Sequence, residues 1–190
     1  YGEIFNKRNQ NFRIQKNKPD LILAFKNDGH VLPAPEGFGI GSSRNYYFSH
    51  MYNCIYDCRY CFLQGMYSSA NYVVFVNFED FETSLKKVIK EISENKTTFF
   101  SGYDCDSLAL ESLTGFAKYM LPFFKKYPQI DIEFRTKSIQ REPFLLQKPM
   151  KNVIIAYSLM PELISSSLDN KAPSISKRIK LSFESMSLKR

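Results

Sequence analysis

The chain has 190 residues, and its 26 Lys and Arg residues exceed its 19 Asp and Glu residues to give a formal net charge of +7. This length predicts one domain with a hydrophobic core, and the basic balance fits either a phosphate-rich partner or an ordinary solvated surface. No apolar run reaches the roughly 18 residues that a membrane-spanning helix requires, so we expect no membrane partner. Three of the four cysteines are clustered, as metal ligands are, which favours a reducing compartment and therefore the cytoplasm.

Residues 1–20 are polar and basic, and they predict a mobile lead-in to a core that spans residues 21–190. The core opens with an apolar run at 21–25, which we expect to pack as a strand or as the end of a helix. A loop rich in Pro and Gly follows at 33–41. The final residues, 181–190, resemble a helix that runs out rather than a domain that ends, so we expect the core to be incomplete at its C-terminus.

Strands and helices are predicted to alternate along the core. Residues 44–50 and 72–77 have the composition of strands, and Asn77 can cap the helix that follows. In that helix, apolar residues recur at helical spacing, namely Phe78, Phe81, Leu85, Val88, Ile89 and Ile92.

The second half of the chain continues this alternation. Pro122 is expected to kink or end the helix in which it lies. The run at 153–157 is continuously apolar, as a buried parallel strand requires. The expected elements are strands at 97–101, 130–136 and 153–157, and helices from Asp106 or Ser107 through Met120, at 142–147, and from Ser174 onward.

This alternation predicts βαβ units and an α/β fold with a parallel sheet. Side chains that can carry chemistry fall where the strands end. The cysteines follow the strand at 44–50, and Ser101, Lys137 and Ser158 end or follow the next three strands. Active sites of (β/α) barrels collect at this edge of the sheet, so we expect these residues to lie near one another.

The cysteines Cys54, Cys58 and Cys61 are spaced Cys-x3-Cys-x2-Cys. Thiolates suit iron–sulfur clusters and zinc, and a closed site needs four protein ligands. Three thiolates on a four-iron cluster leave one iron open to an outside ligand, which is the arrangement of a reactive site. The alternative is a zinc site completed by Cys105 or His50, although zinc sites prefer paired spacings and no second pair is present.

The cysteine spacing, with aromatic residues around the third cysteine, resembles the radical S-adenosylmethionine (SAM) enzymes. Further motifs resemble the spore photoproduct lyase family and its DNA repair photolyase-like relatives. They occur in the same order as in that family, at 61–67, 72–81, 101–111, 135–138 and 172–178.

The resemblance implies a partial (β/α)6 radical SAM barrel, with about four βα units present in this chain. It implies that the three clustered cysteines bind a [4Fe-4S] cluster and that SAM is the cosubstrate. Four residues then have implied SAM contacts: Tyr60 with the adenine, Ser101 and Lys137 with the carboxylate, and Ser158 near the ribose. The residue types fit, because an ammonium and a hydroxyl bind carboxylates and an aromatic face stacks on a base.

The resemblance also implies an activity. Such an enzyme cleaves SAM reductively to a 5′-deoxyadenosyl radical, and the lyases use this radical to repair a thymine dimer in DNA. The expected partners are DNA or another nucleic acid, and a low-potential electron donor such as flavodoxin or ferredoxin.

The chain departs from the lyase pattern at three positions. Phe99 stands where the lyases have a hydrogen-donating cysteine, Phe62 replaces a relay tyrosine, and Tyr103 falls where many relatives have a glutamate. Cys105 is the one spare thiol, and it is either a relocated hydrogen donor or an inert buried cysteine. A radical SAM enzyme with another substrate and a non-catalytic, metal-stabilised binding module are the alternative functions.

Overall fold

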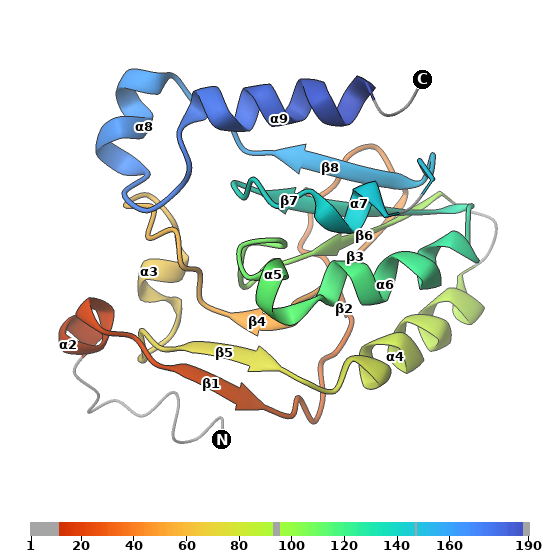
Figure 1. Ribbon diagram of the computed structural model, residues 1–190. Coiled ribbons are helices and arrows are strands. Elements are labelled where there is room, and N and C mark those ends of the chain that lie inside the picture. The colour runs from red at the N-terminus through yellow and green to blue at the C-terminus, as the bar shows by residue number, and fades with distance from the viewer. Residues whose placement is uncertain (1–11, 93–95, 147, 188–190) are drawn as a thin grey trace.

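The computed structural model describes residues 12–92, 96–146 and 148–187, which fold into two β-sheets flanked by helices (Figure 1). The larger sheet has the strand order β2-β3-β6-β7-β8. Its strands are β2 (Leu32–Pro33), β3 (Arg44–Phe48), β6 (Thr97–Ser101), β7 (Ile130–Thr136) and β8 (Val153–Tyr157). The last four run parallel, whereas β2 is antiparallel to β3. All five residues of β6 are buried, so β6 lies at the centre of the sheet.

The smaller sheet has the order β1-β5-β4, with strands β1 (Leu21–Ala24), β5 (Tyr72–Phe75) and β4 (Met51–Tyr52). β4 follows β3 closely along the chain and pairs antiparallel with β5. The predicted strand at 72–77 is therefore real, but it lies outside the parallel sheet. The first parallel strand of the larger sheet is β3, and the cysteines follow it along the chain.

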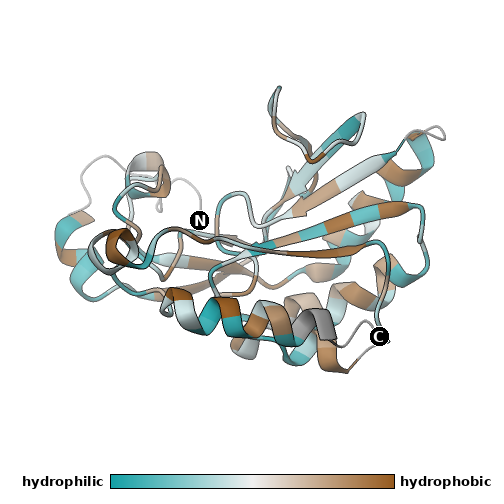
Figure 2. Cartoon of the chain, turned by 90° about the horizontal axis from the view of Figure 1, so that it is seen from above, coloured by the Kyte–Doolittle hydropathy of each residue, from teal (hydrophilic) through white to brown (hydrophobic). Residues whose placement is uncertain are grey.

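The longer helices cover the parallel sheet. α4 (Phe78–Glu91) and α6 (Phe116–Lys125) contact each other and pack on the strands through one core (Figure 1). Figure 2 shows polar and apolar residues alternating along the helices, as amphipathic helices require. The remaining helices are α2 (Phe12–Asn17), α3 (Leu63–Met66), α5 (Glu111–Thr114), α7 (Glu142–Leu145), α8 (Glu162–Leu168) and α9 (Ile175–Ser187).

Four predicted parallel strands, each followed along the chain by at least one helix, are confirmed by β3, β6, β7 and β8. The helices expected at 78–92, at 142–147 and after Ser174 are also present, as α4, α7 and α9. Position 147 lies outside the described residues. Among the helices described, none is long and apolar enough to cross a membrane.

The prediction of one helix from 106 to 120 is wrong. Gly115 has a φ of +60° and separates α5 from α6. The carboxylate of Glu111 accepts hydrogen bonds from the backbone N–H groups of Ala117 and Lys118, at 2.9 and 3.0 Å, so α6 has its own capped start. Pro122 then falls inside α6 instead of ending it.

Two further expectations need correction. Asn77 occupies the position before α4, but it makes no capping hydrogen bond, because its amide exchanges hydrogen bonds with the backbone of Lys26. The strand at 153–157 is not fully buried. Only Val153 is buried in β8, because β8 pairs with β7 alone and lies at the edge of the sheet.

Candidate functional site

The three clustered cysteines lie on the loop between β4 and α3, at the carboxyl end of the parallel sheet. The backbone turns sharply here, since Asn53 and Asp57 have φ values of 64° and 49°. Such left-handed conformations are most accessible to Asn and Asp among residues with a side chain. The Asn53 amide also donates hydrogen bonds to the backbone oxygens of Ser69 and Asn71, at 2.9 and 2.7 Å. The start of the cysteine loop is therefore fixed to the segment that leads into β5.

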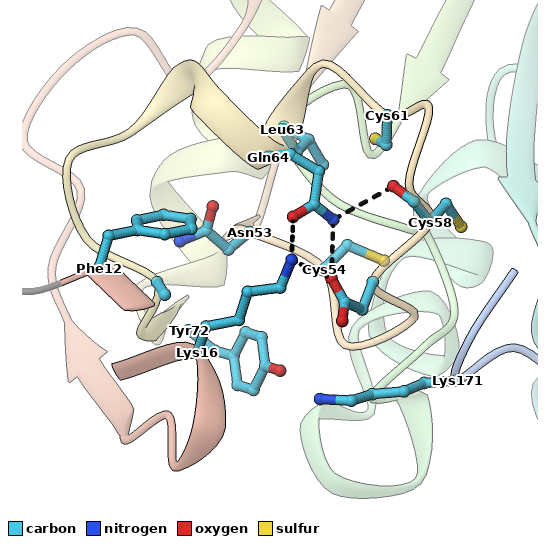
Figure 3. A pocket seen from close by; sticks show the side chains of 12 residues that line it. Phe12, Lys16, Asn53, Cys54, Cys58, Cys61, Leu63, Gln64, Tyr72 and Lys171 are labelled. Carbon is cyan, nitrogen blue, oxygen red and sulfur yellow. Dashed lines mark hydrogen bonds and ion pairs between the residues drawn. The ribbon is translucent and has the colours of Figure 1, made fainter. Parts of the chain in front are cut away.

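All three cysteines line one cavity (Figure 3). None of them forms a disulfide, and Cys58 is buried whereas Cys54 and Cys61 are partly buried. They pack beside Tyr56 and Ala109 in a small apolar cluster. The three thiols of this loop are therefore free to act as metal ligands.

Burial raises the pKa of the Cys54 thiol, and it raises the pKa of Cys58 to about 11 although the nearby Lys137 acts in the opposite direction. Without metal these groups are protonated thiols at neutral pH. Metal thiolate bonds form with release of protons.

The three loop thiols suit the soft ligation of an iron–sulfur cluster, whereas a closed zinc site would need a fourth protein ligand. Zinc holds thiolates at about 2.3 Å from a single ion, so its ligands must converge. Within the described ranges, no group of three or more His, Cys, Asp or Glu side chains is arranged to hold one metal ion. Cysteines that bind different irons of a cluster need not converge in this way.

Neither expected fourth zinc ligand faces the loop cavity. The His50 ring stacks on Phe116, with ring centroids 4.0 Å apart and planes at 6°. Cys105 is buried in a separate apolar cluster with Met51 and Val74. Burial raises the pKa of the Cys105 thiol well above its usual range. Its suggested role as a hydrogen donor is untested and stays a prediction.

Ser101 is the last residue of β6, and it is 2% exposed. Its hydroxyl oxygen is buried and has no hydrogen-bond partner in the described part of the protein. A buried polar group without a partner costs about 1–3 kcal/mol, so such an atom at the carboxyl end of a strand fits a ligand contact.

Lys137 and Tyr60 meet beside the cysteine loop, although they lie far apart in the sequence. The Lys137 ammonium is 5.4 Å from the centroid of the Tyr60 ring, within cation–π range. Burial lowers the pKa of Lys137, but Tyr60, Cys58 and Asp169 outweigh it and the net pKa is raised. Lys137 therefore holds its positive charge, and the Tyr60 ring is 50% exposed and can stack on a base.

Asp106, which the sequence suggested only as a candidate start of a helix, organises this edge of the sheet. Its carboxylate accepts hydrogen bonds from the Thr136 hydroxyl at 2.6 Å and from the Lys137 backbone N–H at 2.7 Å. Burial raises the pKa of Asp106, and the same hydrogen bonds oppose this rise. Asp106, in the loop after β6, therefore holds the end of β7 and the backbone of Lys137 in place.

A buried ion pair between Asp169 and Arg178 was also missed by the sequence analysis. Arg178 is fully buried and donates to Asp169 at 2.8 Å and to the backbone oxygen of Ser158 at 2.9 Å. Asp169 accepts the Tyr60 hydroxyl at 2.9 Å and forms an isolated β-bridge with Cys58. One ion pair therefore links the end of β8 to the cysteine loop. In the sequence, the signal for this ion pair is limited to two opposite charges, Asp169 and Arg178, in the last third of the chain.

The structure separates Phe99 from the other two departing residues, Phe62 and Tyr103, whose rings contact each other. Phe99 is fully buried and stacks on Tyr46 at 5.4 Å, so position 99 faces the core. Tyr103 lies near the cysteine loop, with its ring centroid 5.6 Å from Phe62 and 4.5 Å from Tyr47.

Comparisons with known proteins agree with this geometry. The family model for spore photoproduct lyase matches residues 41–186. A solved variant of spore photoproduct lyase superposes with a TM-score of 0.81 at 18% identity, covering 95% of this chain and 52% of that chain. Another variant, solved with bound AdoMet and dinucleoside spore photoproduct, gives a TM-score of 0.78 at 18% identity, covering 88% and 48%.

A search of curated proteins finds no significant match. The chain spans about half the length of the solved structures it resembles. These likenesses confirm the predicted α/β fold.

Proposed function

Because the chain belongs to the spore photoproduct lyase family, we propose that it is a radical SAM enzyme whose [4Fe-4S] cluster is bound by Cys54, Cys58 and Cys61. The observation that carries this proposal is the unpartnered Ser101 hydroxyl at the same strand edge as the cysteine loop. This buried polar atom has no partner among the described residues, and a bound ligand would satisfy it. The charge held by Lys137 beside the loop adds to it.

The chain's own residues would bind and orient SAM. The Lys137 ammonium and the Ser101 hydroxyl suit its carboxylate, and the exposed Tyr60 face suits its adenine. Ser158, which is held at the end of β8 by Arg178, suits the ribose. A cluster held by these cysteines would supply the one-electron chemistry that cleaves SAM reductively.

The proposed substrate is nucleic acid, and specifically a thymine-dimer lesion in DNA. Support comes from three solved structures of spore photoproduct lyase that hold dinucleoside spore photoproduct and from the +7 charge of the chain. Phe99 supports the second candidate, a radical SAM reaction on another substrate, because it stands where the lyases have the hydrogen-donating cysteine and has no thiol of its own. We also propose the cytoplasm as its location and flavodoxin or ferredoxin as its electron donor.

Anaerobic reconstitution with iron and sulfide tests the proposal. A brown protein with an EPR-active reduced cluster that converts SAM to 5′-deoxyadenosine is the expected result. A colourless protein that retains zinc and cleaves no SAM would reject it. Adding dinucleoside spore photoproduct then separates the two substrate candidates, since only the lyase reaction returns thymine.

A further inference from the structure

The helix α2 lies against the cysteine loop, although it precedes the first strand. The Gln15 side-chain oxygen accepts hydrogen bonds from the Ser69 hydroxyl at 3.1 Å and the Ala70 backbone N–H at 3.0 Å. α2 is therefore attached to the segment between α3 and β5. Residues 1–11, the rest of the expected mobile lead-in, lie outside the described residues.

Lys16 of α2 reaches directly into the cysteine loop (Figure 3). Its ammonium lies 2.7 Å from the Asp57 carboxylate and donates to the Gln64 side-chain oxygen at 2.7 Å. The Gln64 amide in turn donates to Asp57 at 2.9 Å and to the backbone oxygen of Cys58 at 3.2 Å. These contacts form a closed ring of polar groups on the loop.

The same residues line the cavity that contains the cysteines. Lys16, Asp57 and Gln64 face it together with Cys54, Cys58 and Cys61. Phe12, also from α2, completes that side. α2 therefore covers the cavity with one aromatic ring and one positive charge.

We infer that Lys16 is a positioning residue for the cluster, which closes the cysteine cavity and places a positive charge beside it. This inference rests on the proposed function. Reduction adds negative charge to a cluster, so a neighbouring ammonium stabilises the reduced form and raises the reduction potential. Residues around a metal site that orient its ligands also slow its loss.

Replacing Lys16 by Met tests this. The Lys16→Met variant loses the ammonium that pairs with the Asp57 carboxylate, while Gln64 still donates to that carboxylate and Lys171 still lines the cavity. We expect a lower midpoint potential in EPR-monitored redox titration, and release of iron to a chelator about ten-fold faster. Lys16→Arg should restore both values, because it keeps the charge and the hydrogen-bond donors.

Arg13→Met is the matched control, since Arg13 is an exposed cation on the same helix. It should leave the potential and the rate of iron release unchanged. Equal potentials for Lys16→Met and Arg13→Met would overturn the inference while leaving the proposed function intact. No cluster in the unsubstituted chain would overturn both. Circular dichroism checks that each variant is folded, and a folded Lys16→Arg variant keeps the comparison valid if Lys16→Met unfolds.

Discussion

Single residues at the candidate site owe their properties to neighbours that are distant in the sequence. Lys137 keeps its charge because Tyr60, Cys58 and Asp169 surround it and outweigh the effect of burial on its pKa. Ser101 is buried by its place in the central strand, and its hydroxyl has no partner among the residues that the structure describes. The sequence identified both residue types, but only the fold explains why they are suited to a ligand.

Lys137→Ala should weaken SAM binding. Loss of a charged hydrogen bond to the SAM carboxylate is expected to raise the dissociation constant by the equivalent of about 1.5–3 kcal/mol. Calorimetric titration of the reconstituted protein measures this. Lys151→Ala removes an exposed lysine and serves as the control. An unchanged dissociation constant for Lys137→Ala would reject its assignment to the carboxylate.

Cys105→Ala should leave the metal site intact. Cys105 packs with Met51 and Val74 and does not line the loop cavity, so the variant should bind as much iron as the unsubstituted chain. Cys58→Ala, which removes a proposed ligand, should lose the cluster. Loss of metal from Cys105→Ala, measured by metal analysis, would instead favour the closed site with four cysteines.

At the scale of elements, the junction of β3 and β4 is packed against the first turn of α6. His50 lies at this junction and is 1% exposed, with its ring stacked on Phe116. Burial, with a smaller effect of Lys26, lowers the pKa of His50 to about 3. The strand-to-helix contact therefore requires a neutral imidazole.

This packing predicts a loss of stability in acid. The unfolded chain protonates His50 near pH 6.5, whereas the folded chain resists protonation down to about pH 3. Its contribution is thus present above pH 6.5 and falls by up to about 1.4 kcal/mol per pH unit below it. Urea unfolding between pH 7 and pH 4 measures the slope. His50→Gln should flatten this slope and His30→Gln should not, and an equal slope in all three proteins would contradict the prediction.

At the scale of the whole molecule, an early and a late segment of the described chain both contact the cysteine loop. α2 contacts it through Lys16, and the segment before α9 contacts it through Asp169. Figure 1 shows α2 and α8 on the same side of the molecule as the loop. The site is therefore assembled from segments that lie far apart along the described chain, and its integrity depends on long-range contacts.

Arg178→Met should destabilise the fold and disturb the loop. Removing one member of a buried ion pair leaves an uncompensated charge and typically costs about 3–5 kcal/mol. Chemical unfolding measures this loss. Lys177→Met, at the exposed neighbouring position, should have little effect. Equal stability of the two variants would show that the Asp169–Arg178 pair does not hold the loop.

The sequence by itself determined which segments form the parallel strands, which cysteines are clustered and which residues lie at the strand ends. These features depend on local periodicity and on ligand chemistry. Tertiary structure decided the rest. Glu111 and Gly115 divide a helix that periodicity alone would continue, since the Glu111 carboxylate replaces backbone hydrogen bonds at the start of α6. Lys16 pairs with Asp57, 41 residues along the chain, and the ion pair of Arg178 joins it to Asp169, 9 residues away, so hydrophobic periodicity encodes neither contact.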